Sequence, residues 1–143
     1  MIGLAVHHFG IGTTRPEKTL LALRALGYVE ERRVRDELQG VDLIWCIRGE
    51  SPAMEIVSAI GPESPLQSIF ARQLDAGLYH LCFEMITPLA ETLAGFESRA
   101  LRVITVREPL PAILFDGREV SFHMIQGLGL VELLGQHPTK CGA

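Results

Sequence analysis

The hydrophobic and polar residues of this chain alternate in short runs, which glycine, proline and charged residues separate. In the first run, Leu4–Gly12, alternation places His8 on one face together with Val6, Gly10 and Gly12. The two glycines leave little side-chain bulk beside the histidine. The pattern therefore predicts a β-strand that carries a histidine on a sparsely filled face.

A helix and three further strands are predicted after this strand. The segment Thr14-Arg15-Pro16-Glu17 has the form of a capping box, in which Thr14 and Glu17 satisfy free amides where a helix starts. Gly27 ends this helix. Strands are then predicted over Tyr28–Glu37, Val41–Ile47 and Ala53–Ile60, because turn-like segments divide these apolar runs.

The second half of the chain repeats this order. A connecting helix is predicted over Pro65–Leu74, with Ser64 as its cap. A second helix is predicted to start at Thr87-Pro88. Asp116-Gly117 fits a tight hairpin turn, because glycine adopts positive φ at low cost. The strands predicted in this half are Gly77–Phe83, Leu101–Val106, Ala112–Phe115, Glu119–Ile125 and Leu130–Leu134.

The chain thus has the pattern of strand, helix and meander, twice over. We predict an α+β fold in which two βαβββ modules, at about 4–60 and 76–135, pair into a curved mixed sheet around a concavity. A linker helix at about 64–75 joins the modules. We expect residues 1–143 to form a single domain, since this length is ordinary for one.

Each module carries a histidine on its first strand and a glutamate on its last: His8 and Glu55, then His80 and Glu132. A lone histidine in an apolar strand is more often a hydrogen-bonded core residue than a metal ligand. A buried carboxylate, however, is so unfavourable alone that a partner is expected. Four such residues on equivalent elements indicate one metal site. Two imidazoles and two carboxylates suit an octahedral Co²⁺, Ni²⁺, Mn²⁺ or Zn²⁺ ion with positions open to substrate.

Other candidate residues give weaker signals. Cys82 should face the same way as His80, but a buried cysteine is usually just a small apolar residue. His123 either lines the cavity or points outward, and Arg118 either holds a substrate anion or is solvated. Trp45 is expected to pack in the core.

Composition and charge indicate which classes of binding partner the protein is expected to have. The net charge of −4 is mild and no basic stripe is present, so we expect no nucleic-acid partner. No apolar run reaches the roughly 20 residues that cross a bilayer, and the start of the chain lacks the features of a signal peptide. Three cysteines without paired spacing argue against a disulfide framework. We expect a cytoplasmic protein without a membrane partner, and a homodimer as its assembly.

Seven short segments between Val6 and Leu134 also carry a family resemblance. On these segments the chain resembles the vicinal oxygen chelate superfamily of glyoxalases and bleomycin-resistance proteins, and within it the methylmalonyl-CoA epimerase branch. The resemblance implies that His8, Glu55, His80 and Glu132 are the metal ligands. The segments are His8-Phe9-Gly10-Ile11, Leu26-Gly27-Tyr28, Gln39-Gly40-Val41, Met54-Glu55-Ile56-Val57, Ser64-Pro65-Leu66, Gly77-Leu78-Tyr79-His80 and Leu130-Val131-Glu132-Leu133.

The resemblance implies an isomerase mechanism. A small-molecule substrate, expected to be an acyl-CoA thioester, would present its carbonyl to the metal while a carboxylate removes the α-proton. Glu132 would serve as both ligand and base, and Glu55 is the other carboxylate of the catalytic pair. The chain departs from the family at one place. Epimerases carry a further carboxylate on the strand after the Gln-Gly-Val turn, where this chain has Leu43, and the adjacent Asp42 should face away.

Two other functions stay open at this stage. A lactoylglutathione lyase of the glyoxalase-I type would use the same four ligands, again with Glu55 and Glu132 as ligand and base. A non-catalytic protein that binds a drug or metabolite, as in bleomycin resistance, would typically lack these metal ligands. The sequence names neither the substrate nor the metal, because loops and cavity walls set specificity within a fold.

Overall fold

The computed structural model of the chain describes residues 3–61 and 75–137. The predicted connecting helix, Pro65–Leu74, lies outside these residues. Neither of the two described α-helices is long and apolar enough to cross a membrane. The elements are β1 (Leu4–Thr13), α1 (Pro16–Ala25), β2 (Val29–Asp36), β3 (Val41–Ile47), β4 (Ala53–Ala59), β5 (Ala76–Met85), α3 (Leu89–Ser98), β6 (Val103–Pro111), the 3-10 helix η1 (Ile113–Phe115), β7 (Glu119–Ile125) and β8 (Gly129–Leu134).

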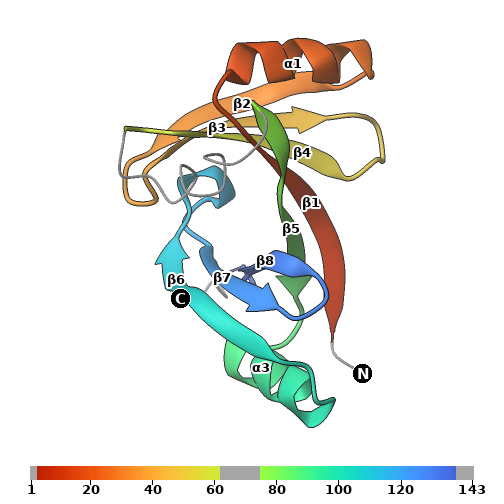
Figure 1. The fold of residues 1–143 in the computed structure, drawn as a ribbon, viewed down its shortest axis with the longest axis vertical. Coiled ribbons are helices and arrows are strands. Elements are labelled where there is room, and N and C mark those ends of the chain that lie inside the picture. Colours follow the sequence, from red (N-terminus) through yellow and green to blue (C-terminus); the bar gives the residue numbers. More distant parts are fainter. Residues whose placement is uncertain (1–2, 62–74, 138–143) are drawn as a thin grey trace, which may run out of the picture. The chain divides into compact units, whose positions relative to one another are not determined.

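The order of one strand, one helix and three strands occurs twice along the chain (Figure 1). Strand β1 pairs with β4 in parallel, whereas β2 with β3, β3 with β4, β6 with β7 and β7 with β8 pair antiparallel. These pairings make the sheet mixed. The predicted α+β fold of two βαβββ modules is therefore confirmed.

The chain divides into two compact units whose boundaries differ from those of the modules. The first unit is His7–Leu81, and the second unit comprises Met1–Val6 together with Cys82–Ala143. Strands β1 and β5 each contribute residues to both units. The first unit contains the strand order β2-β3-β4-β1-β5, and the second contains β1-β5-β8-β7-β6. Both histidines of the predicted metal site consequently belong to the first unit.

Helix α1 covers one face of the sheet in the first unit. Its side chains Leu20 and Leu23, three residues apart and thus on one side of the helix, are buried against Ile44 of β3 and Ile56 of β4. These apolar contacts occupy the face that alternates with Glu55 along β4, so the two faces of the strand have different roles. One face builds the core, and the other carries polar groups.

The predicted capping box does not form at the start of α1. The helix begins at Pro16 with Arg15 as its N-cap, and no side chain caps it. Thr14 therefore lies one residue before the cap, too early to accept a bond from the first turn. Its hydroxyl donates instead to the carbonyl oxygen of Asp75, at 3.4 Å.

The second unit has its own core beneath α3. Phe96 of this helix packs in a buried cluster with Met85, Ile125, Val131 and Leu133. Val131 and Leu133 alternate with Glu132 along β8, so Glu132 faces away from α3. As in the first unit, one face of the sheet is apolar and covered by a helix.

The predicted strand Ala112–Phe115 is wrong. Strand β6 continues to Pro111, which pairs with Glu119, and residues 112–118 close the loop between the two strands. Within this loop the amide of Phe115 donates to the carbonyl of Ala112, which gives the 3-10 turn η1. Asp116 and Gly117 follow with φ of 55° and 85°, the two positive values that the predicted tight turn requires.

The packing of α1 predicts that replacing its buried and its exposed leucine will have different effects on stability. Leu20 is 1% exposed and Leu21 is 67% exposed. We expect Leu20→Ala to lower the free energy of unfolding by about 2–5 kcal/mol, because it leaves a cavity in the core. Leu21→Ala should change it by less than about 0.5 kcal/mol. Urea unfolding of both variants measures the difference, and an equal loss in the two would contradict this packing.

Candidate metal centre

Three strands of the first unit bring His8, Glu55 and His80 together. His8 lies on β1, Glu55 on β4 and His80 on β5. The parallel register sets Gly10 of β1 opposite Glu55, and β1 alternation places His8 on the same face as Gly10. His8, Glu55 and His80 are 0%, 3% and 5% exposed. Residues from distant parts of the sequence thus form one buried polar cluster.

The donor atoms of this cluster converge closely. The Nε2 atoms of His8 and His80 are 3.1 Å apart. Each also lies 3.6 Å from a carboxylate oxygen of Glu55. Two ligand atoms in neighbouring positions around an ion, each about 2.1 Å from it, are separated by about 3 Å. The three side chains therefore fit a divalent ion in both donor type and spacing.

Burial keeps both imidazoles neutral. Desolvation lowers the pKa of His8 well below its usual value, and the nearby His80 and His7 lower it further. Desolvation also lowers the pKa of His80, to about 3. A neutral imidazole keeps a lone pair on one ring nitrogen, which is the form that binds a metal. The 3.6 Å contacts of the two imidazoles with Glu55 are accordingly not ion pairs at neutral pH.

Gly10 makes room for the His80 ring. A Cβ atom at this position would lie 2.3 Å from Cε1 and 2.7 Å from Nε2 of His80. Such separations are far below van der Waals contact, so any larger residue would displace the ring. The alternation in the sequence predicts low bulk beside His8 but does not indicate that the free space belongs to His80. Gly10 is thus a residue that shapes the cluster.

His7 and Trp45 fix the orientation of His8. The Nδ1 atoms of His7 and His8 are 2.8 Å apart, which leaves Nε2 of His8 directed at His80 and Glu55. The Trp45 ring contacts His8 edge-on, with centroids 5.0 Å apart. Trp45 pairs in register with Glu55 and so lies on the polar face of β3. The prediction that Trp45 packs in the core is wrong, since β3 turns Ile44 and Cys46 to the core instead.

Glu132 belongs to the second unit, where β8 pairs with β7 so that Glu132 lies opposite Phe122. It is 3% exposed. Burial raises the pKa of its carboxyl group to about 7, although a hydrogen bond with the Cys82 side chain opposes the rise. Cys82, itself fully buried, thus contacts a candidate base. Metal binding by Glu132, and by the three residues of the first unit, stays a prediction.

The position at which a further carboxylate is expected carries a buried leucine. Leu43 pairs in register with Val57, two residues after Glu55 on β4, so it lies on the same face as Glu55. Asp42 faces the other way, as alternation predicts, and forms a bidentate pair with Arg35 at 2.8 and 2.9 Å. The face of β3 that carries Trp45 therefore has an apolar side chain, Leu43, where the further carboxylate is expected.

Two further candidate residues belong to the second unit. His123 is fully buried on β7, where Ser121 and Thr105 bind its two ring nitrogens. Arg118 is also buried, and its guanidinium donates twice to the carbonyl of Gly135. The alternative that Arg118 is solvated is therefore wrong, whereas the alternative that it holds a substrate anion stays a prediction.

Comparisons with known proteins agree with this fold. A family model described as the glyoxalase/bleomycin resistance protein/dioxygenase superfamily matches residues 7–122. No curated protein sequence matches the chain. The matched span contains His8, Glu55 and His80, whereas Glu132 follows it.

Solved structures of epimerases share the fold. Methylmalonyl-CoA epimerase of Mycobacterium tuberculosis has a TM-score of 0.72 at 16% identity, covering 96% of this chain and 91% of that one. A variant of the Streptomyces coelicolor enzyme in complex with 2-nitronate-propionyl-CoA has a TM-score of 0.73 at 18% identity, covering 96% and 100%. A hypothetical protein of Bacillus halodurans has a TM-score of 0.75 at 18% identity, covering 97% and 99%. At these identities the likeness concerns the fold.

The space at Gly10 leads to a prediction about metal affinity. We expect Gly10→Ala to weaken Co²⁺ binding by at least about tenfold, because the added methyl group displaces the His80 ring by more than ligand geometry tolerates. Gly77→Ala is the matched control, since a Cβ at that position of β5 meets nothing within 4 Å. Titration calorimetry of both variants measures the affinities. Equal affinity for the two would show that the His80 ring is not held against β1.

Proposed function

Because this chain belongs to the glyoxalase/bleomycin resistance protein/dioxygenase superfamily, we propose that it is a divalent-metal-dependent, epimerase-like enzyme that removes and returns a proton α to a carbonyl group. The observation that carries the proposal is the cluster of His8, Glu55 and His80. Their donor atoms lie 3.1 to 3.6 Å apart and all three side chains are buried. Neutral imidazoles and a carboxylate are donor groups that bind divalent metal ions.

In this proposal His8, Glu55, His80 and Glu132 hold one Co²⁺, Ni²⁺, Mn²⁺ or Zn²⁺ ion. The ion supplies Lewis acidity toward a carbonyl oxygen. His8 and His80 contribute Nε2, and the contact between His7 and His8 keeps that nitrogen directed at the ligand position. The Trp45 ring and the buried strand surface beside it exclude water from the imidazoles.

Glu132 is the proposed base. Burial raises the pKa of its carboxyl group to about 7, and a bound divalent ion would lower it again, so that the carboxylate is ionised and able to accept a proton at neutral pH. The proton would move from the α-carbon of the substrate to a carboxylate oxygen of Glu132. Burial among apolar neighbours of β7 and β8 creates this basicity, because an ionised carboxylate is poorly solvated there.

The proposed substrate is an acyl-CoA thioester. The support comes from structural relatives that are named methylmalonyl-CoA epimerases, among them one in complex with methylmalonyl-CoA and another with 2-nitronate-propionyl-CoA. The α-proton of a thioester is acidic enough for a carboxylate base when its carbonyl is polarised. The coverage of those chains, 96% and 100%, means that the likeness extends over the full fold.

Leu43 limits the chemistry that this chain can perform. A complete epimerisation removes the proton from one face of the α-carbon and returns it to the other, which requires a group on each face. With a buried leucine where the second carboxylate is expected, the proposed enzyme has its base on one face. We therefore propose proton exchange with retained configuration as its basic reaction.

The proposal is tested by metal content together with proton exchange. Protein purified without a histidine tag should contain about one divalent ion per chain by plasma mass spectrometry, and His8→Ala should lose it. In deuterated water the wild-type protein should exchange the α-proton of a methylmalonyl-CoA analogue. Glu132→Gln should lower the exchange rate by about 10²-fold or more, because the amide cannot accept the proton.

Glu97→Gln is the matched control, since Glu97 is an exposed carboxylate on α3. It should leave both metal content and exchange unchanged. Failure of the wild-type protein to retain any of the four metals after reconstitution would overturn the proposal. Retained metal without exchange on any thioester would leave the metal centre in place but exclude the proposed reaction.

The leucine leads to a separate prediction. Leu43→Glu should convert exchange with retention into epimerisation of the thioester, because it adds an acid or base to the polar face of β3. Leu43→Gln has the same shape without a titrating group and should not epimerise. Chiral chromatography of the product measures the outcome. Rapid epimerisation by the wild-type protein would contradict the one-faced reaction.

A further inference from the structure

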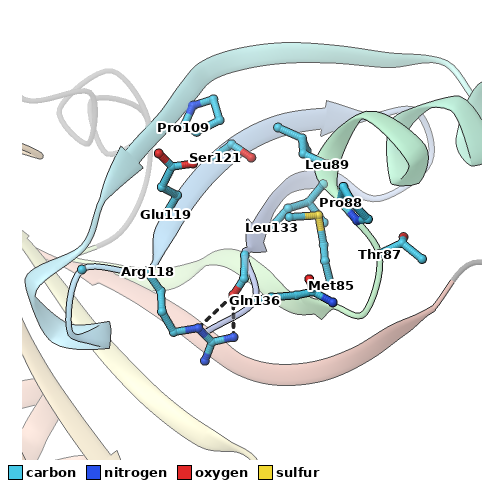
Figure 2. A pocket seen from close by; sticks show the side chains of 12 residues that line it. Met85, Thr87, Pro88, Leu89, Pro109, Arg118, Glu119, Ser121, Leu133 and Gln136 are labelled. Atoms are coloured by element: carbon cyan, nitrogen blue, oxygen red, sulfur yellow. Dashed lines mark hydrogen bonds between the residues drawn. The ribbon is translucent and has the colours of Figure 1, made fainter. Parts of the chain in front are cut away.

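A cavity lies in the second unit, on the side of the sheet that carries α3. Its volume is about 330 Å³, and Met85, Leu89 and Leu133 supply apolar walls (Figure 2). Ser121 also lines it and pairs in register with Leu133. Because Leu133 and Glu132 point to opposite faces of β8, this cavity lies on the other face of the sheet from the proposed base.

Ser121 forms the first member of a hydrogen-bonded chain of three side chains. Its Oγ lies 2.8 Å from Nε2 of His123, two residues along the same strand. Nδ1 of that histidine lies 3.0 Å from Oγ1 of Thr105 on β6. A hydroxyl, an imidazole and a third group that orients the imidazole make up the arrangement found around activated nucleophiles.

The environment favours a neutral His123. Its side chain is completely buried, and desolvation lowers the pKa of the ring, while Glu108 opposes this change. With the Nδ1 proton donated to Thr105, Nε2 is left as an acceptor for the Ser121 hydroxyl. In that arrangement the imidazole can take the serine proton.

The cavity also contains groups that could stabilise a developing negative charge. Pro88 and Leu89, which begin α3, line it, and no side chain caps this helix. The start of a helix carries a partial positive charge and free amides. Arg118 lines the cavity as well, held in place by two hydrogen bonds to the carbonyl of Gly135 (Figure 2), and it also pairs with the carboxylate of Glu84 at 3.3 Å.

We propose that Ser121 is a nucleophile with His123 as its base and Thr105 as the positioning residue, and that the cavity accepts the acyl group of a small carboxylic ester. This activity is independent of the proposed metal centre. The small volume and the apolar walls of the cavity suit a short acyl chain.

The step is balanced as an acyl transfer. The Ser121 oxygen bonds to the carbonyl carbon while its proton passes to Nε2 of His123. The bond from that carbon to the leaving alkoxide then breaks, and His123 returns the proton to the departing alcohol. Water, activated by the same histidine, releases the carboxylic acid and restores Ser121.

The competing account is that Ser121 and Thr105 merely satisfy a buried histidine. That account predicts no chemical reactivity at Ser121. Reactivity therefore separates the two, and neither metal content nor proton exchange enters the comparison.

The test uses the full chain and two probes, a fluorophosphonate and p-nitrophenyl acetate. We expect intact mass spectrometry to show one phosphonyl group per chain, located on the peptide that contains Ser121, and burst release of nitrophenol. Ser121→Ala should abolish both. Ser98→Ala is the control, since that exposed serine of α3 donates to the carbonyl of Gly95, accepts from Arg99 and does not line the cavity.

Thr105 and His123 variants test the relay. His123→Gln should slow labelling by about 10²-fold, within the usual range for loss of a general base. Thr105→Val should slow labelling severalfold, because valine cannot bond the imidazole, and Thr105→Ser should restore the rate, because serine keeps the hydroxyl. Thr105 is exposed, so its replacement leaves the core intact. Matching urea midpoints for the Thr105 variants establish that they fold. Unlabelled wild-type protein, or label that persists in Ser121→Ala, overturns the proposal.

Discussion

The site depends on the cost of burying polar groups. Two imidazoles and a carboxylate are withdrawn from water in the first unit, and each would be strongly destabilising if it were buried alone. The contact between the two Nε2 atoms, at 3.1 Å, offsets part of that cost, and desolvation lowers the pKa of both rings. Helix α1 builds the apolar core on the opposite face, so the strands can give their other face to these groups. Stability and site chemistry are thereby divided between two faces of the same strands.

Much of the fold could be predicted from local pattern. Strands β3 and β7 have the predicted bounds because alternation and flanking turn residues both mark their ends. The segment 112–115 could not be assigned in this way, since its apolar residues are equally compatible with a strand. Its 3-10 turn follows from the pairing of Pro111 with Glu119, which is a tertiary constraint. The capping box failed for a similar reason, because Pro16 fixed the helix start one residue later than the motif implies.

The candidate site was predictable in its members and not in its arrangement. Glu55 and the two histidines stand out because polar residues interrupt apolar strands at repeated places. The role of Gly10 depends on where β5 lies beside β1, and the place of Trp45 depends on the register between β3 and β4. Neither the role of Gly10 nor the place of Trp45 can be predicted from local periodicity. The unit boundaries also cut through β1 and β5, so that the first unit contains both histidines while Glu132 belongs to the second.

The central claim is that His8, Glu55 and His80 bind one divalent ion. A crystal of the protein grown with Co²⁺, measured at the cobalt absorption edge, tests it most directly through the anomalous difference density. The account predicts one strong peak about 2.1 Å from Nε2 of both histidines, with a Glu55 oxygen in the same coordination sphere. A well-ordered crystal with no peak there, or with cobalt bound only by surface residues, would contradict the claim.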